Sequence, residues 1–260
     1  MPNLIIYYTI FHKQAKIVYN ANMWKTLKQN LKQIFFPQFC LYCKKEGQII
    51  CQDCLSLIEI NEFQFCPFCS IPTRVMGAGK CKKHTGFALS GVFTAADYKN
   101  SLIKKMVANL KYRPFLQELS KPIADIIITH LILNKNQFLP ILTNNSLIIP
   151  IPLFPKKEKT RGFNQSLLIA KEISSYLQMP VSTDNLLRIK DTSSQVKLSK
   201  AERWQNMANA FVTKNPEIIR NKTFFLIDDV FTTGATMEQC ASSLKKAGAK
   251  SVWGIAFCRE

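Results

Sequence analysis

Seven of the nine cysteines and one of the three histidines form four pairs, each with two residues between its members. Two intervening residues allow both side chains of a pair to face one ion, and four such ligands complete a tetrahedral zinc site. Eight ligands predict two zinc ions, and full coordination by protein predicts a structural role. Sequential pairing is favoured and interleaved pairing stays open; in the sequential arrangement the ligands are Cys40, Cys43, Cys51 and Cys54 for one ion and Cys66, Cys69, Cys81 and His84 for the other.

The segment IDDVFTTGAT, residues 227–236, combines adjacent carboxylates with a loop suited to a phosphate group. The apolar run 224–227 predicts a strand buried on both faces, with Asp228 and Asp229 at its carboxyl end. Backbone N–H groups at a helix N-terminus bind phosphate, and carboxylates accept hydrogen bonds from vicinal hydroxyls. A ribose 5-phosphate fragment matches both features, because its hydroxyls suit the carboxylates and its phosphate suits the loop. Neither a P-loop nor a GxGxxG motif is present, so the sequence does not support a nucleotide triphosphatase or a dinucleotide-binding protein.

A charged segment, residues 156–161, lies between a predicted strand and a predicted helix. A mobile cationic loop at a strand end can close over a pyrophosphate group and exclude water. A solvated surface loop is the alternative, because runs of charge usually face water. We favour the functional interpretation, since the segment belongs to the same sheet-edge region as the phosphate loop. Its candidate binding residues are Lys159 and Arg161.

Strands and helices are predicted to alternate along the chain, as in an α/β protein. Strands are expected at 87–98 (a strand or hairpin), 146–151, 224–227 and 251–258. Helices are expected at 100–111, 117–133 and 164–178, with another that ends at Gly248, and 134–145 is expected to be a polar connection. Such connections predict a parallel sheet with a ligand site at the carboxyl ends of its strands.

The formal net charge is +18, yet residues 223–260 hold equal numbers of basic and acidic residues. A charge excess spread over the rest of the chain favours a polyanion or a phosphorylated ligand, with a merely soluble basic protein as the alternative. Aromatic residues interleaved with cations in the cysteine-rich segment suit single-stranded nucleic acid, but we slightly favour their being the segment's own core; they are Phe39, Tyr42, Phe63, Phe65 and Phe68.

The sequence predicts a folded protein, because hydrophobic residues make up 47% of it. It holds no apolar run long enough for a transmembrane helix, so no membrane insertion is expected. The apolar start lacks a basic n-region and a cleavage site, which argues against a signal peptide, and we expect residues 1–22 to be a poorly packed extension upstream of Met23. The cysteines are then expected in a reducing compartment, the cytoplasm, where metal binding outweighs disulfides.

IDDVFTTGAT resembles the phosphoribosyl-pyrophosphate (PRPP) motif of type I phosphoribosyltransferases. In that family the two acidic residues bind the ribose hydroxyls, the following loop binds the 5-phosphate, and magnesium accompanies PRPP. The resemblance therefore implies that Asp228 and Asp229 bind the ribose. It also implies that the phosphate is bound by Thr232, Thr233, Gly234, Ala235 and Thr236.

Three further stretches, 147–173, 191–211 and the multi-cysteine N-terminus, resemble the ComF, or ComFC, competence family. This resemblance implies an α/β, parallel-sheet type I phosphoribosyltransferase fold preceded by a small zinc-binding module. The expected divisions are 1–35 for an extension and helix, 36–86 for a double zinc-ribbon-like module, and 87–260 for the phosphoribosyltransferase-like domain. The family's role implies DNA uptake during natural transformation, with other DNA-uptake proteins as possible partners.

Two classes of function follow from these features. The first is a competence protein that binds PRPP and handles incoming single-stranded DNA. The second is an active phosphoribosyltransferase on an unidentified acceptor, for which the sequence shows neither a base-specificity segment nor a general base, so its catalytic residues are unknown. A PRPP-sensing regulator is a lesser alternative. Gln195, Arg203 and Asn206 either contact a base or phosphate or bond the backbone of a cap over the site.

Overall fold

The computed structural model describes residues 38–69, 71, 73–75, 79–192 and 200–260. The expected N-terminal extension, the helix predicted before residue 36, and Gln195 lie outside this part of the chain. The chain divides into two compact units, Met1–Leu55 and Ser56–Glu260. The described part of the smaller unit holds a bridge between Phe39 and Glu46 and the short helix α2, Gln52–Leu55.

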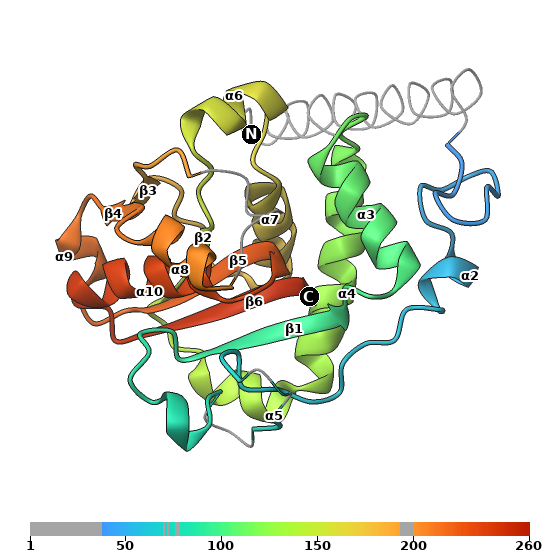
Figure 1. The fold of residues 1–260 in the computed structure, drawn as a ribbon. Helices are drawn as coiled ribbons and strands as arrows, with labels where there is room; N and C mark the ends of the chain where they lie inside the picture. The colour runs from blue at the N-terminus through green and yellow to red at the C-terminus, as the bar shows by residue number, and fades with distance from the viewer. Residues whose placement is uncertain (1–37, 70, 72, 76–78, 193–199) are drawn as a thin grey trace, which may run out of the picture. The chain divides into compact units, whose positions relative to one another are not determined.

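The larger unit is built on four parallel strands in the order β1-β6-β5-β2 (Figure 1). The central strand β5 is buried on both faces, as its apolar run predicts. Phe224 belongs to the core on the side of α10 (Ala235–Lys246), whereas the next residue, Phe225, packs against Phe138 at 5.5 Å between ring centroids. The strands of this sheet are β1 (Gly91–Asp97), β2 (Ser146–Pro150), β5 (Thr223–Phe231) and β6 (Ser251–Arg259).

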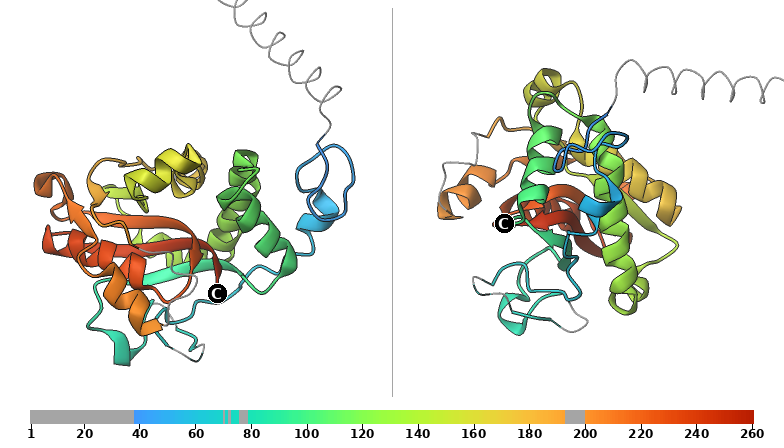
Figure 2. Two further views of the ribbon diagram at one scale, coloured as in Figure 1. Left: turned by 45° about the horizontal axis from the view of Figure 1, so that its top comes forward. Right: turned by 90° about the vertical axis from the view of Figure 1, so that its right-hand side faces the viewer.

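Helices cover both faces of this sheet (Figure 2). The helices α4 and α7 pack on each other and on the sheet, and α10 packs against β6 and against β4, which pairs with β3 in a small two-stranded antiparallel sheet. The remaining bounds are α3 (Ser101–Lys111), η2 (Gln117–Leu119), α4 (Ser120–Leu133), α5 (Lys135–Phe138), η3 (Leu139–Ile141), α6 (Pro155–Arg161), α7 (Gln165–Leu177), β3 (Leu186–Arg188), α8 (Lys200–Met207), β4 (Phe211–Thr213), α9 (Pro216–Ile219), α10 (Ala235–Lys246) and η1 (Lys82–His84).

The predicted α/β class with a parallel sheet is confirmed, and two local predictions are wrong. Residues 134–145 are not only a polar connection, since α5 and η3 form there and bury Phe138. The charged segment after β2 is the helix α6, not an irregular loop. Pro155 stands in its first turn, lysines and glutamate favour the helical state, and Gly162 ends it at φ 82°.

The second cysteine cluster belongs to the larger unit, where Cys66 and Phe68 are part of the same hydrophobic core as β5 and α10. This division differs from the boundary at residue 86 that the sequence predicted. The reason is packing, because Cys66, Phe68 and Val75 are buried in the same core as residues of β5 and β6. Among the described residues, no helix is long and apolar enough to cross a membrane.

Candidate functional site

A cavity of about 330 Å³ lies at the carboxyl end of β5. Its walls come from segments far apart in the sequence, including α3, α6, α7, β3, α8 and the loop before α10. The carboxyl edge of a parallel sheet is where ligands bind in α/β proteins. The charged residues that line it are Lys111, Lys157, Arg188, Arg203, Asp228, Asp229 and Glu260.

Asp228 is a half-buried carboxylate on the cavity wall. Its Oδ1 accepts hydrogen bonds from Ser166 Oγ at 3.0 Å and from the backbone N–H of Asp229 at 2.9 Å. Ser166 is placed by the cap of α7, where the Asn164 side chain accepts from the Ser166 N–H and donates to the Ile151 carbonyl. Burial and the neighbouring Asp229 carboxylate raise the pKa of Asp228 to about 7.

Asp229 is 1% exposed and forms an ion pair with Lys111, the last residue of α3, at 2.9 Å between Oδ2 and Nζ. Its other oxygen accepts from the Val230 N–H at 3.0 Å. Burial lowers the pKa of Lys111, but the carboxylates of Asp229 and Asp228 raise it by more, so the net shift is upward. The two adjacent aspartates therefore have different partners, although both line the cavity.

The loop between β5 and α10 places a helix N-terminus at the cavity. Gly234 is the residue before α10 and has φ 82°, a left-handed conformation that favours glycine. A Cβ atom there would lie 2.9 Å from the Phe231 ring, so the site also lacks room for a side chain. Thr232, Gly234 and Thr236 line the cavity.

The cationic residues at the cavity are not those the sequence singled out. Lys157 of α6 lines the cavity and donates to the Thr192 carbonyl at 3.2 Å, whereas Lys159 is exposed and absent from the lining. Arg161 is half-buried and donates to the Gln165 side chain, which does line the cavity. On a helix, positions 157 and 159 face different directions, and a loop prediction carries no such information.

The structure brings together five of the nine residues proposed for PRPP binding, namely Asp228, Asp229, Thr232, Gly234 and Thr236. Thr233, Ala235, Lys159 and Arg161 lie outside the lining, although Thr233 Oγ1 accepts from the Ala235 N–H at 3.4 Å. Sequence reasoning missed Lys111, Ser166 and Arg188. Lys111 and Arg188 carry no motif, but Ser166 directly follows the sequence RGFNQ, residues 161–165, in which Asn164 and Gln165 are both buried. Of the 191–211 stretch, Arg203 lines the cavity and lies 3.6 Å from the Glu260 carboxylate.

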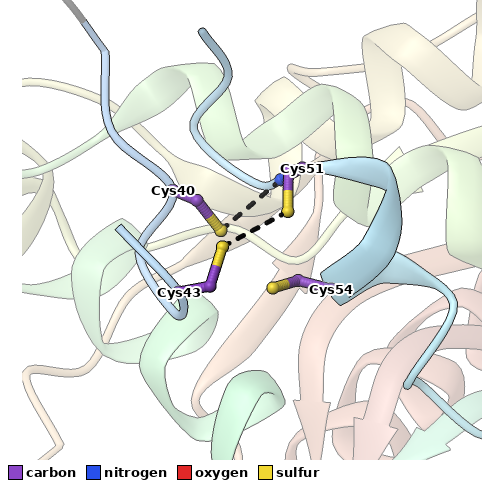
Figure 3. A group of neighbouring side chains, drawn as sticks. All are labelled: Cys40, Cys43, Cys51 and Cys54. Carbon is purple, nitrogen blue, oxygen red and sulfur yellow. Dashed lines mark hydrogen bonds between the residues drawn. The ribbon is translucent and has the colours of Figure 1, made fainter. Parts of the chain in front are cut away.

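In the first cysteine cluster, the four sulfur atoms turn toward a common point (Figure 3). All lie within 4.8 Å of one another, and Cys43 Sγ is 3.5 Å from Cys51 Sγ. The Cys51 N–H donates to Cys40 Sγ at 3.5 Å. Burial raises the pKa of Cys40, but backbone N–H donors outweigh that effect and lower it to about 6, which favours a thiolate. The residues grouped here are Cys40, Cys43, Cys51 and Cys54.

The second cluster groups Cys66, Cys69, Cys81 and His84 in the larger unit. The Nδ1 atom of His84 lies 3.2 Å from Cys81 Sγ, 3.4 Å from Cys66 Sγ and 3.6 Å from Cys69 Sγ. The histidine therefore faces the thiols rather than solvent. Both groups follow the sequential pairing that the spacing favoured.

The donor sets fit zinc. A Zn–S bond of about 2.3 Å in a tetrahedron separates two sulfur atoms by roughly 3.8 Å. The sulfur–sulfur distances of 3.5 Å in the first cluster and 3.6 Å in the second are close to that value. Three thiols with one imidazole, or four thiols, are the ligands of structural zinc sites, and thiolates disfavour magnesium or calcium.

The aromatic residues near the clusters divide between core and surface. Phe68 is buried and stacks on Phe87 at 3.8 Å between centroids. Phe39, Tyr42 and Phe63 are each 40% to 50% exposed. The Arg74 guanidinium lies over the Phe63 ring at 3.5 Å, an arrangement of cation and aromatic surface that suits nucleic acid.

Comparison with known proteins identifies related chains. A family model described as "Phosphoribosyl transferase domain" matches residues 164–260. "Competence protein F" of Haemophilus influenzae is 39% identical over 114 residues, which are 42% of this chain and 49% of that protein. "DNA utilization protein YhgH" of Escherichia coli K12 is 25% identical over 229 residues, 86% of this chain and 97% of that protein. "Competence protein ComFC" of Bacillus subtilis is 26% identical over 227 residues, 85% and 88% of the two chains.

The parallel sheet, the loop at the carboxyl end of β5 and the domain match define a phosphoribosyltransferase-like domain. The relatives extend the likeness beyond this domain, since two of them align with more than four fifths of the chain. The chain is thus similar to competence proteins of the ComF type, and the part that matches a phosphoribosyltransferase domain lies at its C-terminal end. A solved glutamine PRPP amidotransferase from B. subtilis overlaps 54% of this chain and 25% of that one at 15% identity, with a TM-score of 0.32, which is too low to support an argument.

Proposed function

We propose that the cavity binds PRPP with magnesium and that the protein is a cytoplasmic competence factor that handles incoming single-stranded DNA. The observation that carries the PRPP assignment is the meeting of the Asp228–Asp229 pair and the N-terminus of α10 in one cavity. Carboxylates accept hydrogen bonds from ribose hydroxyls, and N–H groups at a helix N-terminus bind phosphate. Lys111, Lys157 and Arg188 add positive charge for a polyanion. Magnesium would be held by the pyrophosphate oxygens and these carboxylates, and it would neutralise charge on the leaving group.

Calorimetry of PRPP with Mg²⁺ tests this assignment. Asp228→Asn removes a charged acceptor and should weaken binding by about 1.5–3 kcal/mol, roughly tenfold to 150-fold. Asp125→Asn is the control, because that carboxylate is exposed on α4 and pairs with Lys121 at the surface. Equal affinity in the two variants would remove the sugar-binding role from Asp228. Replacing both Asp228 and Asp229 with alanine should abolish binding.

The DNA assignment draws on charge and on the names of the relatives. The net charge of +18 favours polyanion binding, and the similar proteins are described as competence or DNA utilization proteins. Single-stranded DNA should bind without strong sequence preference and with an affinity that falls steeply with salt. Each phosphate contact contributes about 0.7 to the slope of log affinity against log salt. A flat slope with tight binding would contradict this electrostatic account.

Lysine variants test which segment of the surface contacts the DNA; the surface that contacts it is called the DNA track. Alanine at Lys156, Lys157 and Lys159 tests α6, and alanine at Lys82 and Lys83 tests the second cysteine cluster. Alanine at the exposed Lys99 and Lys135 is the control for the loss of two charges, and the same variant with Lys171→Ala added is the control for the loss of three. A reduced slope in one test variant and not in its control places the track there, and equal slopes in every variant remove both segments from it.

We further propose that the two clusters bind one structural zinc ion each. Elemental analysis of the purified protein should give two ions per chain, and Cys51→Ser and Cys81→Ser should each lose one. Cys240→Ala is the control, because that buried thiol belongs to neither group of candidate ligands. A count of one ion or none in the unaltered protein would contradict the proposal.

Phosphoribosyl transfer is the second candidate function, and the domain match with an intact carboxylate pair favours it. A pyrophosphate-release assay with PRPP and a panel of nucleobases, with and without single-stranded DNA, separates transfer from binding alone. Release that depends on one acceptor supports the enzyme. PRPP binding without release by any acceptor supports the DNA-handling protein or a PRPP-sensing regulator.

A further inference from the structure

The loop between β5 and α10, residues 232–234, is called the phosphate loop here and packs directly on the second cysteine cluster. The segment Cys66–Cys69 provides two of the four ligand residues, and between them lies the buried side chain of Phe68. A Cβ atom at Gly234 would lie 3.4 Å from Phe68 Cε1, an ordinary contact distance. Phe68 also stacks on Phe87 and lies 6.3 Å from the Trp204 ring of α8. The Phe68 ring therefore lies between the cluster and the loop that leads into α10.

A second connection runs through Arg259, the last residue of β6. Its guanidinium donates to the carbonyl oxygens of Cys66, Pro67 and Cys69 at 3.3 to 3.4 Å. The same guanidinium lies 5.8 Å from the centre of the Phe231 ring, at the end of β5. One side chain thus ties the backbone of the cluster to the strand from which the phosphate loop emerges.

A third connection joins the first turn of α10 to the chain that leaves the cluster. The buried carboxylate of Glu238 accepts hydrogen bonds from the backbone N–H groups of Ala88 at 2.7 Å and Leu89 at 2.8 Å. These residues follow His84, the fourth member of the cluster, within five positions. The start of α10 is therefore fixed from two directions, by Phe68 behind Gly234 and by Glu238 one turn later.

The segment around the second cluster has little secondary structure that could keep these contacts in place. In the described part of residues 63–90, the only helix is the three-residue η1 and the only ladder contact is a bridge between Phe65 and Arg74. Small segments of this kind take their conformation from the metal, because ligand binding and folding are coupled. Loss of the ion would release Cys66 and Cys69, and with them the position of Phe68.

We propose that metal at the second cluster positions the phosphate loop through Phe68 and Arg259, so that metal occupancy there and anion binding at the loop strengthen each other. The affinity half of this proposal rests on the PRPP binding proposed above. Coupling between sites is reciprocal, with a typical factor of about 5 to 150. The first cluster lies in the other compact unit and makes none of these three contacts, so it serves as the internal control.

The experiment compares the zinc-loaded full-length protein with Cys81→Ser and Cys51→Ser. Hydrogen exchange of the amides in 232–238 reports loop order without any ligand, and calorimetry reports the affinity for PRPP with Mg²⁺. We expect faster exchange and an affinity at least fivefold weaker in Cys81→Ser, with both unchanged in Cys51→Ser. Equal effects of the two cysteine variants, or no effect of Cys81→Ser, overturn the proposal.

Phe68→Leu guards against simple unfolding of the cluster, because it keeps all eight metal ligands. It should retain two zinc ions while exchange at 232–238 becomes faster; retained ions with unchanged exchange overturn the proposed route. Reciprocity is measured in Cys51→Ser, where PRPP should slow zinc capture by a chelator. Loop exchange that responds to zinc in a protein that binds no PRPP would keep the positioning role and reject the proposed ligand. PRPP affinity that stays the same in Cys81→Ser would keep PRPP as the ligand and reject the positioning role of the cluster.

Discussion

Breaking the ion pair between Lys111 and Asp229 should destabilise the larger unit strongly. Lys111→Met leaves the Asp229 carboxylate, 1% exposed, without its countercharge. Removal of one partner from a buried pair costs about 3–5 kcal/mol. The Lys111 side chain is 24% exposed, so water screens the pair in part and the lower end, about 3 kcal/mol, applies. For a unit of this size that corresponds to a fall in Tm of roughly 6–12 °C.

Thermal and urea unfolding followed by circular dichroism, with zinc present, measure the effect. The matched control is Lys121→Met, which breaks an ion pair whose side chains are 68% and 56% exposed on α4. That change should cost less than about 0.5 kcal/mol. Adding Asp229→Asn to Lys111→Met removes the unpaired charge and should recover most of the loss. Equal unfolding free energies for Lys111→Met and Lys121→Met would refute the claim that burial makes the Lys111–Asp229 pair more stabilising than an exposed ion pair.

Two further predictions concern the same loop and its carboxylate. Gly234→Ala should lower the free energy of unfolding more than Gly162→Ala, since both glycines have φ 82° but only Gly234 has a ring 2.9 Å from the added Cβ. The left-handed conformation should destabilise each variant by about 1–2 kcal/mol. Urea denaturation should show a further loss of roughly 1–3 kcal/mol in Gly234→Ala alone. The raised pKa of Asp228, about 7, means that the folded state binds a proton more tightly than the unfolded state, so the unfolding free energy should fall as pH rises from about 4 to 7, and PRPP affinity should rise through pH 7. Ser166→Ala removes a hydrogen bond to the charged form and should move that pKa further up in a carboxyl ¹³C titration, whereas a pKa near 4 in the unaltered protein would contradict the burial argument.

The sequence predicts best where the chemistry is local. Four pairs with the same spacing identify all eight members of the two clusters, because both ligands of a pair come from one short turn. The strand 224–227 and the aspartates after it are equally local, and β5 contains both. In contrast, Lys111 reaches Asp229 from α3, which is more than a hundred residues earlier, and no spacing rule connects them.

Other differences come from competition between local signals. Residues 155–161 carry charge, which suggests a solvated loop, but they also carry a proline in the first turn and a glycine after the last, which favour a short helix. The helix decides which lysine faces the cavity, so Lys157 takes the place expected of Lys159. The predicted boundary at residue 86 treats the cysteine segment as one body, whereas Phe68 and Cys66 pack into the core of the larger unit. Burial against a distant strand is a tertiary property that composition does not reveal.

The charge of the cavity bears on the proposal that a site built on two aspartates binds a polyanion. The C-terminal segment 223–260 supplies the carboxylates Asp228, Asp229 and Glu260 and is neutral as a whole. The cations that face them, Lys111, Lys157, Arg188 and Arg203, all come from elements before residue 223. Four cations against three carboxylates leave the cavity positive. The β5–α10 segment alone is therefore expected to bind hydroxyls but to repel pyrophosphate, and the helices and the strand β3 packed around it would supply the attraction.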